Sequence, residues 1–361
     1  MLEPIKRVLV PLDGSRRAEG AIRYAKRIAS ATDGTIILLR VVEIPTEQAD
    51  AQVYLNRVSA EYKLTEKSDE PVSSQSKASM QSAQATRAVF GEKYAIPIPT
   101  LAKPTEDVIL EWAEAEENKV DLIVLCRRGN NGSERPLGRV AQELVLHRHP
   151  SKPILLVHEA SPEFKRYDAY ALVALDGLSF SETVLPPAAY LIDALGTPEE
   201  RERVRQQKGT LHFVQVVNDS PEPVVKVLDN SFEQVQEKYD DWPEVDKAIN
   251  YLRDMKKTFN DELGAVLVLQ ADGYVVKGED PAETLVKTAE SGKSTGVEGG
   301  YDFLALATHG KGGLLHSLHH KIVHWDLGSV AERVIDATTL PILIVRPHKL
   351  LIWESRYFHT L

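Results

Sequence analysis

Five short segments of this sequence occur twice, in the same order, in the two halves of the chain. The matched pairs are 9–14 with 172–177, 34–42 with 209–217, 121–125 with 302–306, 137–141 with 327–331, and 153–157 with 341–345. A duplicated domain explains five ordered matches far better than chance does. The repeat therefore predicts one fold that is built twice.

The duplication divides the 361 residues into two domains of ordinary size. We place the first domain at residues 1–159 and the second at residues 169–347. Residues 160–168 between them contain Pro162 and several charged residues, which is typical of a short exposed linker. Residues 348–361 form a tail with three aromatic residues, which pack either on a partner or on their own domain.

Apolar runs alternate with helical periodicity in each half. Residues 8–12 and 35–42 are nearly continuous apolar runs, typical of strands covered on both faces. Apolar residues recur at helical spacing from Ala18 to Ala29, and Gly34 stands where a helix ends. This alternation predicts an α/β fold with two tandem, doubly wound, parallel five-stranded sheets. Further strands are predicted at 121–126, 153–157, 169–175, 210–217, 273–276, 303–307 and 342–345, and a helix at 106–116.

Two polar regions interrupt the pattern, residues 45–95 and residues 218–262. The first is rich in Ser, Gln and Ala, and the second carries many charged residues. Each follows the second predicted strand of its half. An exposed helix or loop and a specific partner-binding segment both account for such a composition.

Composition narrows the classes of partner. The formal net charge of −10 argues against nucleic acid as a general partner, because phosphate backbones are repelled. The single cysteine, Cys126, cannot form a disulfide within the chain and fits a reducing compartment. No apolar run reaches the ~20 residues that a membrane-spanning helix needs. We therefore expect a cytoplasmic protein that does not bind a membrane.

Polar residues and glycines of the second half fall beyond the carboxyl ends of its predicted strands, where parallel sheets bind ligands. An aspartate ends the first strand, a valine ends the second, paired glycines follow the fourth, and Gly-Ser opens the last helix. Glycines let a phosphate approach the backbone, and a helix start has unpaired N–H groups. An ordinary turn with an N-cap is the alternative. The candidate nucleotide-binding residues are Asp176, Val217, His309, Gly310, Gly313, Gly328, Ser329 and Val330.

These motifs resemble the universal stress protein family over nearly all of both halves. The similarity rests on Gly310-Lys311-Gly312-Gly313, on 327–334, on the opening strands with Asp13 or Asp176, and on the closing run 340–345. Family members that bind ATP share a Gly-x2-Gly-x9-Gly-Ser/Thr pattern. The resemblance implies a Rossmann-like fold of the adenine nucleotide alpha hydrolase type. It also implies a stress-response regulator that binds ATP or a related adenine nucleotide, with or without Mg²⁺.

The resemblance carries further expectations for single residues and for assembly. Asp176 would meet the adenosine, Val217 the base, and the glycines with Ser329 the phosphates. The last strands of the two halves, which end at Val157 and Val345, would pair within the chain, and a homo-oligomer is left open. Which adenine nucleotide binds is also left open.

The first half holds a second, less complete nucleotide site. Fourteen residues separate Gly313 from Gly328, where the family pattern has nine, whereas only five separate Gly132 from Gly138. Arg139 stands where the pattern has Ser or Thr, and it either supplies charge to a ligand or marks a lost site. The candidate residues of this site are Asp13, Val42, Gly129, Gly132, Gly138 and Arg139.

Several other residues have more than one interpretation. His316, His320 and His324 are spaced to share a helix face, which suits either a zinc site or a solvated loop; without a nearby cysteine we assign no metal. Cys126 is either a core residue or a redox group. Arg127 and Arg128 either approach an anion or are solvated.

We find no catalytic constellation in the sequence. It has no Gly-x-Ser-x-Gly elbow and no Walker Gly-x4-Gly-Lys-Ser/Thr motif. A binding protein is therefore expected rather than an enzyme. A module of the same fold that binds no nucleotide, and a slow ATPase, are the alternatives.

Overall fold

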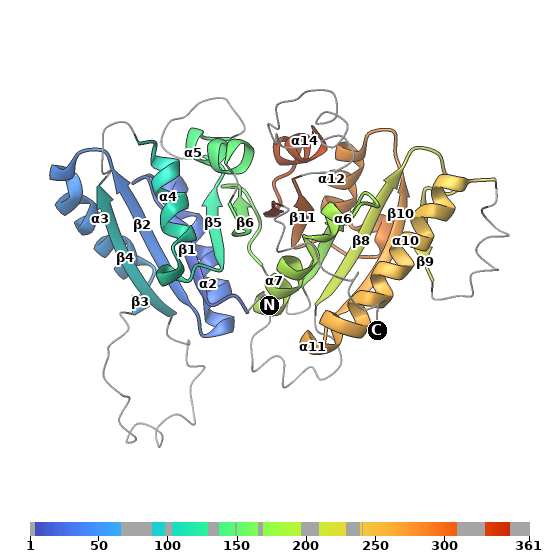
Figure 1. The fold of residues 1–361 in the computed structure, drawn as a ribbon, viewed down its shortest axis with the longest axis horizontal. Coiled ribbons are helices and arrows are strands. Elements are labelled where there is room, and N and C mark those ends of the chain that lie inside the picture. Colours follow the sequence, from blue (N-terminus) through green and yellow to red (C-terminus); the bar gives the residue numbers. More distant parts are fainter. Residues whose placement is uncertain are drawn as a thin grey trace, which may run out of the picture.

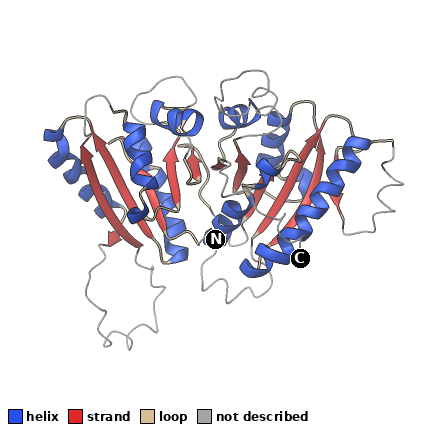
Figure 2. Ribbon diagram, in the orientation of Figure 1, coloured by secondary structure: helices blue, strands red, loops and turns tan. Residues whose placement is uncertain are grey.

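The computed structural model describes residues 4–65, 89–97, 103–128, 137–148, 150–164, 169–195, 209–228, 239, 241–308 and 329–346. These residues form one twelve-stranded sheet with helices on both faces (Figures 1 and 2). No helix within these ranges combines the length and apolar character needed to cross a membrane.

The first half alternates strands and helices along the chain. Its elements are β1 (Arg7–Pro11), α1 (Arg16–Glu19), α2 (Ala21–Thr32), β2 (Thr35–Val42), η1 (Pro45–Glu47), α3 (Gln48–Glu61), β3 (Leu64–Thr65), β4 (Val89–Pro97), α4 (Thr105–Glu114), η3 (Glu116–Asn118), β5 (Leu122–Cys126), α5 (Arg139–Gln142), the π-helical η4 (Glu143–His147) and β6 (Ile154–Val157).

The second half repeats this alternation. Its elements are β7 (Tyr170–Ala174), α6 (Ser179–Glu182), α7 (Leu185–Leu195), β8 (Thr210–Val217), β9 (Val224–Val227), α10 (Pro243–Phe259), the π-helical η5 (Asn260–Gly264), α11 (Ala265–Leu267), β10 (Gln270–Lys277), α12 (Pro281–Ser291), η6 (Lys293–Thr295), β11 (Phe303–Ala307), α14 (Ser329–Ala337) and β12 (Ile342–Val345).

The strand order confirms the predicted fold class. The two predicted sheets are continuous with each other and form a single sheet. The first half runs β4-β2-β1-β5-β6 and the second β12-β11-β7-β8-β10, with β3 and β9 as outer strands. Strands within each set of five are parallel. The seam between the halves is an antiparallel pair, β6 with β12, in which Leu155 lies opposite Leu343. The expected pairing of the last strands is thus present within the chain.

Strand β4 was not located by the sequence analysis, which assigned most of it to a polar interruption. The interrupted region instead contains α3 and the full partner of β2. Glu92 and Lys93 break the apolar run of β4, and Glu92 accepts two hydrogen bonds from the Arg7 guanidinium at 2.7 and 2.8 Å. A strand near the edge of a sheet tolerates such charged positions because it is covered less completely.

Local sequence defines the ends of the helices, as α12 shows. The Asp280 carboxylate accepts from the amide of Ala282 at 3.0 Å, and Pro281 opens the first turn, where no amide is needed. Gly292 ends the helix with a φ of 62°, a conformation that suits glycine. The predicted helix stop at Gly34 differs slightly, because Asp33 takes the left-handed conformation there.

The hydrophobic core lies on both faces of the sheet. Alternate residues of β1 belong to different clusters, Val8 to one and Leu9 to the other. Val173 of β7 joins the cluster of Val8, and Leu172 joins that of Leu9. Each apolar layer therefore continues from one half into the other, as strands buried on both faces require.

The predicted linker, residues 160–168, is only partly exposed. Ser161 is 4% exposed, and its carbonyl oxygen accepts a hydrogen bond from the Tyr24 hydroxyl at 2.8 Å. The Phe164 ring packs edge-on against Tyr24, with centroids 5.2 Å apart, and against Phe303 at 6.5 Å. The expectation of a simple exposed linker was wrong for these two residues, because they fill the seam between the halves.

Helices and a buried arginine also cross the seam. Helix α2 of the first half packs against α7 of the second (Figure 1). Arg346, directly after β12, is buried and donates through Nη2 to the carbonyl oxygen of Val145 in η4 at 2.8 Å. A guanidinium is well suited to this position because carbonyl oxygens at a helix end lack internal donors.

Candidate functional site

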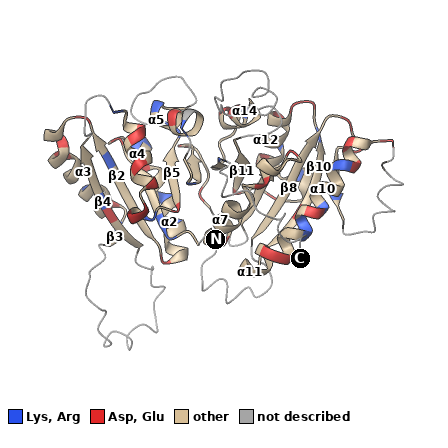
Figure 3. Ribbon diagram, viewed as in Figure 1, with Lys and Arg blue, Asp and Glu red and all other residues tan. Residues whose placement is uncertain are grey.

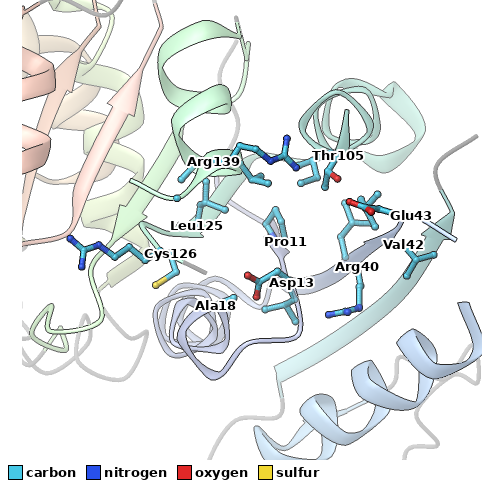
Figure 4. Close-up of a pocket in the computed structure, with 18 of the residues that line it drawn as sticks. Pro11, Asp13, Ala18, Arg40, Val42, Glu43, Thr105, Leu125, Cys126 and Arg139 are labelled. Carbon is cyan, nitrogen blue, oxygen red and sulfur yellow. The ribbon is translucent and has the colours of Figure 1, made fainter. Parts of the chain in front are cut away.

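A cleft of about 360 Å³ opens in the first half, at the carboxyl ends of β1, β2 and β5 (Figure 4). Strand β1 lies between β2 and β5, so the order of strands reverses here, and such a switch point is where doubly wound sheets bind ligands. The cleft is lined by Pro11 to Asp13, Ala18, Leu39 to Ile44, Glu47, Thr105, Ile109, Leu125 to Arg128 and Gly138 to Ala141.

The structure brings together four of the six residues predicted for the first-half site. Asp13, Val42, Gly138 and Arg139 all line the cleft, although they come from three separate parts of the chain. Gly129 and Gly132 lie outside the described residues. The sequence repeat therefore located a real depression in the surface.

A tight turn after β1 forms the floor of the cleft. The Asp13 carboxylate accepts a hydrogen bond from the Ser15 amide at 2.9 Å, which closes the turn. Gly14 has a φ of +90°, and a Cβ atom there would lie 2.3 Å from Nη1 of Arg40. The absence of a side chain at Gly14 therefore lets Arg40 pass beneath the turn.

Arg40 extends toward helix α3 rather than into the centre of the cleft. Its guanidinium carbon lies 5.0 Å from the centroid of the Tyr54 ring, and that of Arg57 lies 5.2 Å from the same ring. Arg57 also pairs with the buried carboxylate of Glu19 at 2.7 Å. Burial raises the pKa of the Tyr54 hydroxyl, so the ring stays neutral between the two cations.

Two ion pairs tie the opposite wall together, between α5–η4 and the first turn of α4. Arg139 pairs with Glu106 at 2.8 Å, and Arg148 pairs with Asp107 at 2.6 Å. The Glu106 side chain is only 4% exposed, whereas that of Arg139 is 58% exposed. In Figure 4 the Arg139 guanidinium extends toward Thr105 along this wall. The pair therefore fixes one edge of the Arg139 guanidinium and leaves the rest toward solvent and the cleft.

Arg127 lines the cleft, but its guanidinium donates hydrogen bonds to the second half. It is 3% exposed, and its Nη1 donates to the carbonyl oxygens of Ile335 at 2.5 Å and Thr338 at 2.6 Å. Its Nη2 donates to the carbonyl oxygen of Leu340 at 3.3 Å. Burial lowers the pKa of Arg127 to about 10, so it remains charged. Neither sequence interpretation, an anion contact or a solvated side chain, was right for this residue.

The candidate residues of the second half that the structure describes occupy equivalent places. Asp176 accepts from the Leu178 amide at 3.0 Å, and Gly177 has a φ of +82°, so the turn after β1 recurs after β7. Gln215 lies beneath it where Arg40 lies in the first half. The carbonyl oxygen of Val217, at the end of β8, accepts from the Gly278 amide at 2.9 Å.

Of the second-half residues expected to bind phosphate, the structure describes only those at the start of α14. Ser329 and Val330, both predicted to bind the nucleotide, are exposed at the start of α14, whereas Ala331 is buried. The remaining predicted residues of this site and the histidine-rich segment lie outside the described residues; they are His309, Gly310, Gly313, Gly328, His316, His320 and His324.

Two residues that act at the first-half cleft were missed by sequence reasoning: Arg40 lines it, and Glu106 pairs with Arg139 in its wall. Arg40 was visible as the one charged residue in the apolar run of β2, and its counterpart in the repeat is Gln215. Glu106 gave no signal, because it stands among other acidic residues of a predicted helix. Cys126, left open above, is buried beside the cleft, and burial raises the pKa of its thiol.

The model of the universal stress protein family matches residues 4–158. None of the curated proteins matches the chain.

Solved structures share the fold of the whole chain. A universal stress protein from Archaeoglobus fulgidus DSM 4304 is 17% identical, with a TM-score of 0.52 over 94% of this chain and 98% of that chain. A putative universal stress protein from Pseudomonas aeruginosa UCBPP-PA14 is 15% identical, with a TM-score of 0.51 over 98% of this chain and 97% of that chain. A universal stress protein solved in complex with cAMP is 22% identical, with a TM-score of 0.31 over 44% of this chain and 100% of that chain. Residues 4–158 therefore match the universal stress protein family, and the second half repeats the strand order of the first.

Proposed function

We propose that the chain is a regulatory protein of the stress-response type that binds an adenine nucleotide. The observation that carries this proposal is the first-half cleft. Asp13, Val42, Gly138 and Arg139, predicted from the sequence repeat and the family resemblance, line one space at the switch point of the sheet. Its volume of about 360 Å³ falls in the range of small-molecule sites, roughly 300–1,000 Å³.

Each lining residue has a role that its chemistry suits. The Asp13 carboxylate accepts hydrogen bonds from ribose hydroxyls or an adenine amino group, and backbone groups beside Val42 meet the base. Gly138 permits close approach of a phosphate, and the Arg139 guanidinium supplies a positive charge. The equivalent proposal for the second half assigns Asp176 and Val217 to the nucleoside and Ser329 to the phosphates of ATP.

The proposed mechanism is occupancy rather than turnover. A bound nucleotide contacts residues from β1, β2, β5 and α5 together, so it stabilises one arrangement of these elements. Arg127 in the wall of the cleft is hydrogen-bonded to the second half, which couples the site indirectly to that half. Steady release of inorganic phosphate from ATP by the purified protein would contradict this part of the proposal.

Mass spectrometry of small molecules released from the purified, denatured protein is the first test, and an adenine nucleotide is expected. Equilibrium dialysis with ATP, AMP and cAMP, with and without Mg²⁺, then measures affinity. Thr105→Trp places a bulky ring at the cleft wall and is expected to weaken binding in the first half. Val53→Trp on the exposed face of α3 is the matched control and should bind as the parent does. No binding of any of these nucleotides at millimolar concentration would refute the function.

A further inference from the structure

The charges along the first-half cleft nearly balance. Four arginines and three carboxylates line the part of the cleft that the structure describes, which leaves a formal excess of one positive charge before Glu106, the partner of Arg139, is counted; they are Arg40, Arg127, Arg128, Arg139, Asp13, Glu43 and Glu47. A phosphate monoester carries about −1.5 to −2 charge at neutral pH, and each additional phosphate adds about one more. The cleft can therefore neutralise one phosphate far better than three.

Two of these arginines are committed to other partners. The buried Arg127 donates three hydrogen bonds to carbonyl oxygens of the second half. The guanidinium of Arg40 lies over the Tyr54 ring, beneath the turn at Gly14. Among the cleft residues that the structure describes, Arg128, Arg139 and the buried Nη1 of Arg40, which has no hydrogen-bond partner, remain to meet an anion.

Arg139 is held so that one edge of its guanidinium is used and another is presented. Its Nη1 donates to Oε2 of Glu106 at 2.8 Å. Figure 3 marks acidic positions along α4 and a basic position at the start of α5, the two elements that this pair joins. A planar guanidinium with five donors can keep this bond and still form a second, bidentate bond to one phosphate group.

The Arg139–Glu106 pair belongs to the first half alone. The sequence repeat places Ser329 at the position of Arg139. Ala282 is the second residue of α12, as Glu106 is the second residue of α4, and both are buried in the first turn. The second half therefore has a hydroxyl and a methyl group where the first has a charged pair.

We infer that the first-half cleft selects a nucleotide with a single phosphate, which Arg139 recognises and Glu106 positions. This inference rests on the proposed function and names the ligand class of its first-half site. Glu106 acts in two ways: it orients Arg139, and it neutralises part of the Arg139 charge, so that less positive charge is left for a further phosphate along this wall. The charge of further phosphates would then face Asp13, Glu43 and Glu47 in the cleft, and repulsion of the wrong ligand is a general source of specificity.

The test measures ligand preference at the first half separately from the second. The full chain is photolabelled with 8-azido-AMP, and peptides from residues 4–158 are quantified while adenosine, AMP, cAMP or ATP competes, with and without Mg²⁺. AMP or cAMP is expected to compete at least about tenfold better than ATP, a factor that corresponds to a modest difference in charge repulsion. AMP is also expected to compete better than adenosine.

The critical variant is Glu106→Ala combined with Arg139→Ser, which installs the residues of the second half. Changing both positions avoids leaving the buried carboxylate without its partner. The double variant should lose the preference for AMP over ATP and for AMP over adenosine, whereas Arg333→Gln on the exposed face of α14 should keep both. Equal or tighter binding of ATP by the parent, or an unchanged preference in the double variant, would overturn the inference while the proposed function stands. Absence of label from the first half would overturn the inference, and absence of label from both halves would overturn the proposed function as well.

Discussion

Arg127→Met is the substitution that tests most directly how the two halves are held together. Methionine keeps an unbranched stem of similar length but removes the guanidinium. The substitution deprives the carbonyl oxygens of Ile335, Thr338 and Leu340 of their donor in a buried position. Ile335 lies in the last turn of α14, where the helix itself supplies no donor.

The expected loss of stability is the difference between two opposing effects. A hydrogen bond to a charged group contributes about 1.5–3 kcal/mol. Burial lowers the pKa of Arg127 from 12.5 to about 10, and the substitution removes this desolvation, which corresponds to about 3 kcal/mol. Three bonds of average strength exceed that desolvation by about 3 kcal/mol, so the free energy of unfolding should fall by about this amount.

Urea unfolding followed by circular dichroism measures this loss, and Arg333→Gln is the control. Arg333 lies on the same helix but is exposed, with Asp280 as its partner, so its removal should leave the unfolding midpoint unchanged. Hydrogen exchange adds a local readout, because amides of 335–346 should lose protection in Arg127→Met. If the variant unfolds with the parent and keeps that protection, the seam does not depend on this arginine and the reasoning is wrong.

Three other substitutions or conditions give measurable outcomes. Burial lowers the pKa of His212 to about 4, below its ordinary 6.5, so the folded state favours the neutral ring. The free energy of unfolding should be highest above pH 6.5 and fall by about 3 kcal/mol as the pH drops to 4. In His212→Gln, the urea midpoint should depend less on pH in that range. Gly14→Ala should destabilise more than Gly296→Ala, because both glycines have a positive φ but only the first would meet Arg40; equal losses in urea would contradict that contact. Phe164→Ala should lower the unfolding free energy by about 2 kcal/mol because this half-buried ring fills the seam, and a melting temperature equal to that of the parent would argue against it.

Repetition in the sequence predicted more of the fold than local propensity did. The strands of the central sheet were found because an apolar run in one half was matched by an apolar run in the other. Strand β4 was not among the matched segments, and Glu92 and Lys93 interrupt its apolar pattern. A strand stabilised by pairing with β2 and by the Arg7–Glu92 ion pair depends on residues far away in sequence. Local composition cannot report such pairing.

The candidate site was predictable to the extent that it follows the strand ends. Asp13 and Val42 end two neighbouring parallel strands, so topology alone brings them together. Glu106 and Arg127 were not predictable in their roles, because each depends on a partner that only the tertiary structure supplies. Glu106 meets Arg139 from another helix, and Arg127 meets α14 from the other half.

The two halves differ in their candidate binding sites, but residues from both halves form the seam between them. The β6–β12 pair joins few residues. Beside it, two buried arginines form hydrogen bonds across the seam, each donating to carbonyl oxygens of the other half. Arg127 of the first half satisfies carbonyl oxygens at the end of α14, and Arg346 of the second half satisfies those of Val145 and Leu146 in η4. Both meet the negative end of a helix dipole, which favours a cation. The first-half cleft is therefore linked to the helix that begins at Ser329 through a single side chain, Arg127, and the nine residues of α14.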